Sequence, residues 1–167
     1  MMLYMLFWMA FSYPVITTHD LDGIYSWGRI FTKCAEYAMW NDFITSDVLF
    51  VPTSGGLDIP YVKISDSAGL PDEDRKAIFV VGGTDTSPIG PSMVFYIIDR
   101  LVQDYVDDVF DIVTLLKTNK IFAIPMLNAD SYEHLSDLWD DTDDKSTLIS
   151  LKNRNFNEWC ENNVGQG

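Results

Sequence analysis

The amino-acid sequence predicts an α/β fold, a three-layer α/β/α arrangement around a mixed sheet. Short apolar runs typical of buried strands alternate with longer stretches in which apolar residues recur every three or four positions, as in helices. The chain has 167 residues, 47% of them hydrophobic, which is enough to bury one core. We therefore expect residues 18–167 to form one domain.

The first 17 residues differ in composition from the rest. They begin with MMLYMLFWMAFS, an uncharged apolar run in which Ala10 and Ser12 have the spacing that a signal peptidase reads. A signal peptide with the mature chain starting near Tyr13 is the first interpretation, and it predicts a secretory or extracellular protein. No basic residue precedes Arg29, so two alternatives stay open. They are an anchor that brings residues 1–17 into contact with a membrane, in a membrane-associated complex, and a buried helix.

The first half of the domain contains a helix and three strands. Apolar residues at helical spacing over 21–38 predict an amphipathic helix, with Asp20 as its N-cap. The apolar runs 48–51 and 61–64 predict two strands joined by a glycine-rich turn. Residues 77–81 are continuously apolar, which is typical of a central strand covered on both faces.

A long helix is expected after Pro91, a residue well suited to a first helical turn. A shorter helix follows at 107–116 and a buried strand at 121–127. The sequence then turns acidic, and we expect an exposed loop there. The predicted order of elements is α-β-β-β-α-α-β.

The charge of the chain restricts its partners. It has 25 acidic and 11 basic residues, a formal net charge of −14. Nucleic-acid binding is therefore not expected, because phosphate contacts need a basic surface. The two cysteines, Cys34 and Cys160, allow at most one disulfide, and the sequence leaves their redox state open.

Three blocks of sequence, in order and spacing, resemble one enzyme family. They are AIFVVGGTDTS at 77–87, IPMLNADSY at 124–132 and LKNRNF at 151–156. They resemble the zinc metallocarboxypeptidases of the carboxypeptidase A/B type, in which one strand ends in Gly-x-His-x-x-Glu, another ends in Asn-Pro-Asp-Gly-Tyr/Phe, and Asp-x-Asn-Arg-Asn-Phe/Trp follows. The resemblance covers nearly all of the chain after residue 17 and implies the N-terminal half of a zinc-carboxypeptidase-like domain, in degenerate form.

The resemblance places other residues where the family binds zinc and stabilises charge. Thr84 and Ser87 stand at the positions of the zinc-binding His and Glu, so we expect no zinc and no other cofactor. Asp140 stands where the family has an Arg that supports the oxyanion, and a negative charge there disfavours the transition state. Asn153 and Arg154 match the residues that hold the substrate carboxylate. A second interpretation is that Arg154 neutralises part of the acidic segment.

The two histidines of the chain are the remaining candidates for a metal ligand. His134 with Asp137 has ligand-like spacing but is expected in a solvated acidic loop, and His19 adjoins the expected helix cap. Neither is favoured, and we expect no metal site.

These observations predict a catalytically inactive relative, a pseudoenzyme with a structural or protein-binding role as a subunit of an assembly. A protein partner or a homo-oligomer would cover an exposed sheet edge near 121–127 or a neighbouring strand. The alternative is a fragment of an active metallocarboxypeptidase that removes C-terminal residues from peptides.

Overall fold

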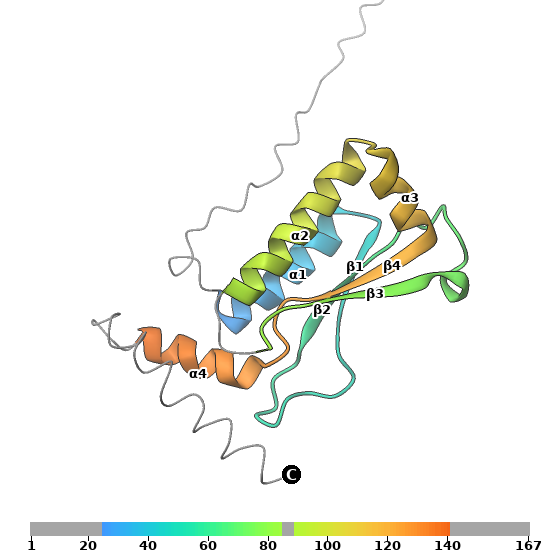
Figure 1. Cartoon of the computed structure of the whole chain (residues 1–167). Helices are drawn as coiled ribbons and strands as arrows, with labels where there is room; N and C mark the ends of the chain where they lie inside the picture. Colours follow the sequence, from blue (N-terminus) through green and yellow to red (C-terminus); the bar gives the residue numbers. More distant parts are fainter. Residues whose placement is uncertain (1–24, 85–88, 141–167) are drawn as a thin grey trace, which may run out of the picture.

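This computed structural model describes residues 25–84 and 89–140, which form a mixed four-stranded sheet and its helices (Figure 1). The α/β class and the mixed sheet predicted from the sequence are confirmed. The described elements follow the predicted order, with one short turn of 3-10 helix and one further helix added. They are α1 (Trp27–Trp40), β1 (Ile44–Val48), β2 (Pro60–Ile64), η2 (Asp72–Asp74), β3 (Lys76–Val81), α2 (Ile89–Val106), α3 (Phe110–Thr118), β4 (Asn119–Ile124) and α4 (Ala129–Asp140).

The strands lie in the order β1-β2-β4-β3. β1 and β2 are antiparallel, β2 and β4 are antiparallel, and β3 and β4 are parallel with Ile78 opposite Ile121. Within the described residues β3 therefore lies at an edge and β4 in the interior. That residues 77–81 form a central strand covered on both faces stays a prediction, because residues 141–167 lie outside the described part of the chain. An apolar run indicates a surface that needs covering, but it does not say what covers it.

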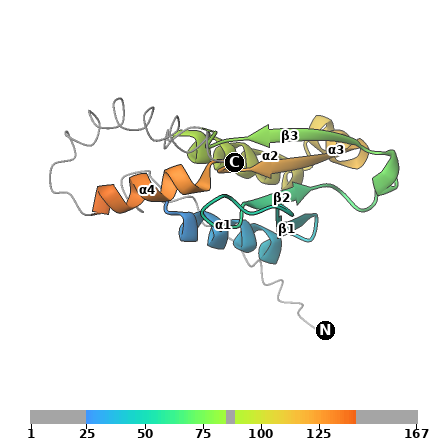
Figure 2. The ribbon, with the colours of Figure 1, turned by 90° about the horizontal axis from the view of Figure 1, so that it is seen from below.

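The core lies on one face of the sheet. Alternate residues of β2 and β4, including Val62, Ile64 and Ala123, point into it and are almost fully buried. Helices α1, α2 and α3 close this face with Ile30, Cys34, Val94, Phe95, Ile98, Val102 and Leu116. α4 lies beyond the end of the sheet, next to the start of α1 (Figure 2). The opposite face of the sheet carries a row of aromatic rings, in which Phe79 stacks on Phe122 at 5.3 Å between centroids.

Two boundaries in the first half differ from the sequence prediction. α1 begins at Trp27, because Ser26 is extended and its hydroxyl accepts a hydrogen bond from the Arg29 N–H as an N-cap. Residues 25 and 26 are not helical, so a helix running through 21–38 is wrong, and its predicted cap Asp20 lies outside the described residues. The first strand spans Ile44–Val48 rather than 48–51. Phe50 is instead fully exposed in the loop.

The second half also shifts by a few residues. Asp108 adopts a positive φ of 56°, a turn that delays the start of α3 to Phe110. β4 spans Asn119–Ile124 and stops at Pro125, earlier than the predicted end at residue 127. The loop expected after residue 128 is wrong, because α4 begins at Ala129. A short helix that contains several acidic residues has the same composition as an acidic loop.

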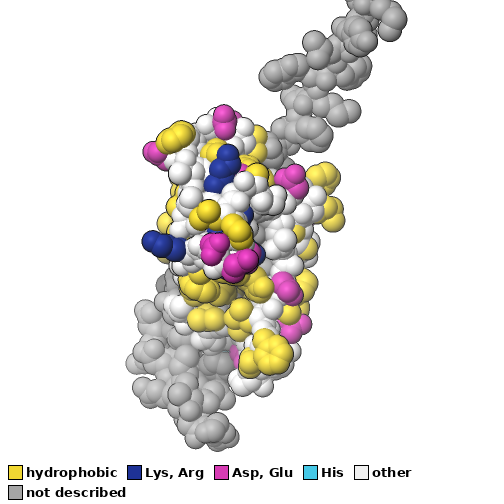
Figure 3. Space-filling view, turned by 90° about the vertical axis from the view of Figure 1, so that its right-hand side faces the viewer, with side chains coloured by type: hydrophobic (Ala, Val, Ile, Leu, Met, Phe, Trp, Pro, Cys, Tyr) yellow, Lys and Arg dark blue, Asp and Glu magenta, His cyan; other side chains and the backbone are white. Residues whose placement is uncertain are grey.

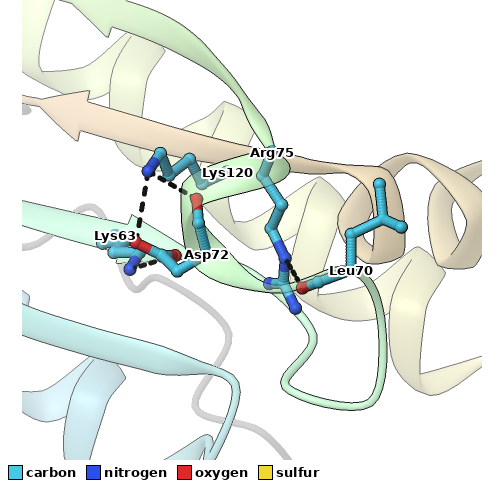
Figure 4. Close-up of polar contacts among 5 residues, drawn as sticks. All are labelled: Lys63, Leu70, Asp72, Arg75 and Lys120. Carbon is cyan, nitrogen blue, oxygen red and sulfur yellow. Dashed lines mark hydrogen bonds and ion pairs between the residues drawn. The ribbon is translucent and has the colours of Figure 1, made fainter.

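The η2 turn is fastened to the sheet by a three-residue charge cluster (Figure 4). The Asp72 carboxylate accepts from Lys63 Nζ at 2.6 Å and from Lys120 Nζ at 3.2 Å, and the Asp72 carbonyl accepts from Lys120 at 2.9 Å. Arg75 adds a hydrogen bond from Nε to the Leu70 carbonyl at 2.6 Å. This end of the molecule has hydrophobic side chains between acidic and basic ones (Figure 3). The cluster fixes the chain as it enters β3.

None of the helices in the described ranges is both long and apolar enough to cross a membrane. The segment 1–17, predicted to be a signal peptide or an anchor, lies outside those ranges.

Candidate functional site

The carboxyl ends of the two parallel strands, β3 and β4, are the candidate site. Ligands of open α/β sheets commonly bind at this end of parallel strands. The segments that follow the two strands stay hydrogen-bonded to each other. Gly82 N–H donates to the Ile124 carbonyl at 2.8 Å, Leu127 N–H donates to the Gly82 carbonyl at 3.0 Å, and Asn128 N–H donates to the Gly83 carbonyl at 2.7 Å. Residues 82–83 and 124–128 are therefore held together by backbone hydrogen bonds. We call them the floor of the site.

Glycines allow three backbone segments to meet on this floor. A Cβ at Gly82 would lie 2.6 Å from the Gly90 carbonyl oxygen, and one at Gly90 would lie 2.5 Å from the Gly83 nitrogen. Gly83 also has a φ of +57°, which L side chains rarely adopt, and a Cβ there would lie 2.8 Å from the Met126 Cα. The sequence Gly82-Gly83 is thus required by the packing of β3, β4 and the start of α2.

The start of α4 forms a second wall. The Asn128 carbonyl accepts from Tyr132 N–H at 3.2 Å, which begins the helix. The carboxylate of Asp130, in the first turn, accepts from the Thr53 hydroxyl at 2.5 Å, the Ser54 hydroxyl at 3.0 Å and the Gly55 N–H at 2.9 Å. Asp130 therefore holds the loop between β1 and β2 against the end of β4.

A buried tyrosine joins α4 to the start of α1. Tyr132 is fully buried, and its hydroxyl oxygen accepts from the Tyr25 N–H at 3.1 Å. Burial raises the pKa of Tyr132 to about 12, so its hydroxyl stays protonated well above physiological pH. Beside it, Glu133 accepts from the Trp27 N–H at 3.1 Å. The first backbone N–H groups of a helix have no acceptor within the helix itself. These two bonds supply acceptors for N–H groups at the start of α1.

The structure locates only part of the predicted site. Thr84 follows β3 in a bend, and its side chain is exposed at the rim of the floor. Asp140 is the last residue of α4. Ser87, Asn153 and Arg154 lie outside the described residues, so their distances from Thr84 stay predictions.

The chemistry around Thr84 does not fit a catalytic zinc. Such a site needs three His, Cys or carboxylate ligands, and a neutral hydroxyl is a poor substitute. Over residues 25–84 and 89–140, no three His, Cys, Asp or Glu side chains are grouped closely enough to hold a metal ion. His134 lies exposed on α4 and is not part of such a group. Its helical position corrects the loop assumed for it.

Asp130 is the site residue whose role the sequence did not reveal. Its carboxylate organises a loop that lies 75 residues earlier in the chain, at Gly55. The available signal was the Thr53-Ser54-Gly55 run, three groups able to donate to a carboxylate. No local pattern connects them to Asp130.

Three comparisons bear on this geometry. A family model described as zinc carboxypeptidase matches residues 42–166. A comparison with curated proteins finds no match. Among solved structures, thrombin activatable fibrinolysis inhibitor (TAFI) is similar with a TM-score of 0.58 and 15% identity, over 71% of this chain and 28% of that chain.

A second similar structure is bovine thrombin-activatable fibrinolysis inhibitor in complex with tick carboxypeptidase inhibitor. It has a TM-score of 0.53 and 15% identity, over 68% of this chain and 34% of that chain. At this identity the two structures support the fold alone. The present chain spans about a third of the length of each.

Proposed function

The chain belongs to the zinc carboxypeptidase family, and on that premise we propose that it is a catalytically inactive member with a structural or protein-binding role. The observation that carries the proposal is Thr84. It follows β3 where the family's first zinc ligand is expected, and it offers only a neutral hydroxyl. Asp140, at the position of the oxyanion arginine, adds a charge of the wrong sign for catalysis.

The rigid construction of the site supports a binding role. The glycine floor and the Asp130 contacts keep the loops of the family's active-site end in a fixed arrangement, although the chemistry of the zinc position is changed. Such a scaffold can present a surface without performing catalysis. The partner is a protein or a second copy that covers the exposed edge of the sheet at β3.

Metal content and peptidase activity test the proposal together. Purified full chain is incubated with excess zinc, dialysed and analysed for metal, and then assayed for release of C-terminal residues from peptides. We expect well under one zinc per chain and no release above buffer. An active carboxypeptidase treated in parallel serves as the control. One tightly held zinc per chain, together with hydrolysis that chelator abolishes, would contradict the proposal.

That contradicting result would instead support the alternative, a fragment of an active metallocarboxypeptidase with a rearranged metal site. The family match over residues 42–166 is the observation that favours this alternative. The chain would then bind zinc through ligands outside the described residues.

A further inference from the structure

A lysine occupies a core position of helix α1. The buried residues of this helix are Ile30, Lys33 and Cys34, and Tyr37 follows Lys33 by four residues, on the same side of the helix. Only 9% of Lys33 is exposed. Lysine is rarely buried unless its ammonium group has partners, because a charge that leaves water loses much of its stabilisation. The Lys33 ammonium must therefore be stabilised by the groups around it.

Two aromatic rings and a carboxylate face this ammonium. Lys33 Nζ lies 5.2 Å from the centroid of the Tyr37 ring and 5.3 Å from that of the Phe95 ring. Both distances are within the range of about 6 Å at which a cation and the face of a ring attract each other. The two rings are stacked, with their centroids 6.1 Å apart. The Tyr37 hydroxyl donates to the Asp99 carboxylate, whose negative charge acts on Lys33.

We propose that Tyr37, Phe95 and Asp99 form an ammonium site between α1 and α2, which the chain fills with its own Lys33 and which takes a primary alkylammonium ion when that side chain is shortened. Ring faces with a carboxylate beside them attract an ammonium group from several directions. Phe95 and Asp99, four residues apart, present one side of α2 to the lysine. The site thus holds the two helices together through a cation, and it is independent of the proposed function.

Charge, and not apolar packing alone, is what the site recognises. Burial lowers the pKa of Lys33, and the Asp99 carboxylate acts against this lowering. On α1 itself Arg29 lowers and Glu36 raises the same pKa. Burial raises the pKa of Asp99, and Tyr37 and Lys33 act in the opposite direction. Each charge therefore stabilises the other where burial disfavours both, and a neutral group of the same size would leave Asp99 without its cation.

Chemical rescue of a shortened side chain tests the proposal. Lys33→Ala removes a portion of the lysine that corresponds to n-propylammonium. Added n-propylammonium chloride should raise the urea midpoint of this variant in a saturable way, because the ion binds the folded state. Sodium chloride at the same concentration and 1-propanol, a neutral molecule of similar size, should not reproduce the rise. In the unaltered chain Lys33 already fills the site, so n-propylammonium should act there only as sodium chloride does.

Lys63→Ala is the matched control. Lys63 is also a paired lysine, with Nζ 2.6 Å from the Asp72 carboxylate, but that partner lies at the surface. n-Propylammonium should not rescue this variant. In Lys33→Ala combined with Asp99→Asn, the same rise should need about tenfold more n-propylammonium or more, because the carboxylate is neutralised. Equal rescue of the two alanine variants, or rescue by 1-propanol as large as that by n-propylammonium, would overturn the proposal.

A nuclear magnetic resonance spectrum of the unaltered chain gives a test that needs no variant. Protons held over the face of an aromatic ring resonate upfield of their ordinary position. The ε-methylene protons of Lys33 should therefore be shifted upfield from those of Lys76, which is exposed at the start of β3, and the difference should vanish in urea. An ordinary ε-methylene position for Lys33 in the folded chain would overturn the proposal, also where Lys33→Ala does not fold.

Discussion

The carboxylate of Asp130, at the start of α4, accepts a hydrogen bond from the backbone N–H of Gly55 at 2.9 Å, across 75 residues of sequence. A Cβ on residue 55 would lie 2.6 Å from Asp130 Oδ1, so any larger residue there would displace the carboxylate. The loop between β1 and β2 and the start of α4 therefore depend on each other. Neither the sequence around Gly55 nor the sequence around Asp130 indicates this contact.

Asp130→Ala should destabilise the chain by about 2 to 3 kcal/mol, because three donors lose a charged acceptor at once. Urea unfolding followed by circular dichroism measures the change. Glu73→Ala is the control, since it removes the same charge from an exposed turn and should change stability by less than about 0.5 kcal/mol. Equal losses in the two variants would show that net charge, not the Asp130 contact, is responsible.

Gly83→Ala should be destabilising by about 2 kcal/mol or more. The residue has a φ of +57°, and the added Cβ would meet the Met126 Cα at 2.8 Å, so both the backbone and the neighbouring chain must move. Gly28→Ala is the matched control. Gly28 lies exposed in α1 with nothing within 4 Å of the added Cβ, and alanine there should stabilise the helix by about 0.5 kcal/mol. The comparison fails if both substitutions shift the urea midpoint in the same direction.

The class of the fold and the order of its elements could be predicted because they follow from local periodicity. The heptad-like spacing of α2 and the apolar run of β4 each carry their own signal. The strand order β1-β2-β4-β3 of the described residues could not be predicted. Pairing partners are set by contacts far apart in sequence, and an apolar strand gives the same pattern whether its neighbour belongs to its own chain or to another.

The site was predictable only at the level of the family motif. Thr84 was identified by its place after a strand, and the structure puts it there. The Asp130 contacts were not predictable, because a carboxylate in the first turn of a helix is an ordinary cap-like residue. Its three partners, Thr53, Ser54 and Gly55, lie in a distant loop whose position the local sequence does not predict. Acidic composition likewise concealed α4, in which Asp130 and Glu133 alternate with the buried Ser131 and Tyr132.

Asp99 should make stability depend on pH. It accepts a hydrogen bond from the Tyr37 hydroxyl between α1 and α2, and burial raises its pKa, while Tyr37 and the Lys33 ammonium act in the opposite direction. A raised native pKa means that the folded state holds the proton more tightly. The stabilisation is therefore complete below the unfolded carboxyl pKa of about 3.9 and is lost as the pH rises through the higher native value.

Asp99→Asn should remove this loss, because asparagine cannot ionise and still offers an oxygen to Tyr37. Urea midpoints measured from about pH 4 to pH 7 should fall less steeply in the variant than in the unaltered chain. Asp104→Asn, on the same helix, is the control, since that carboxylate pairs with Arg100 at the surface at 2.7 Å. Parallel curves for Asp99→Asn and the unaltered chain would rule out a role for Asp99 in the pH dependence.

Cys34 should be unreactive in the folded chain. Its side chain is fully buried under α2, it is a free thiol, and burial raises its pKa to about 12. Because the thiolate is the reactive form, alkylation at pH 8 should be far slower in the native protein than in urea. Mass spectrometry of a Cys160→Ser variant follows Cys34 alone, and a short unfolded peptide with one cysteine gives the reference rate. Native alkylation as fast as that of the peptide would mean that α1 opens readily from the sheet, and would place the core contacts of Cys34 among the least stable in the fold.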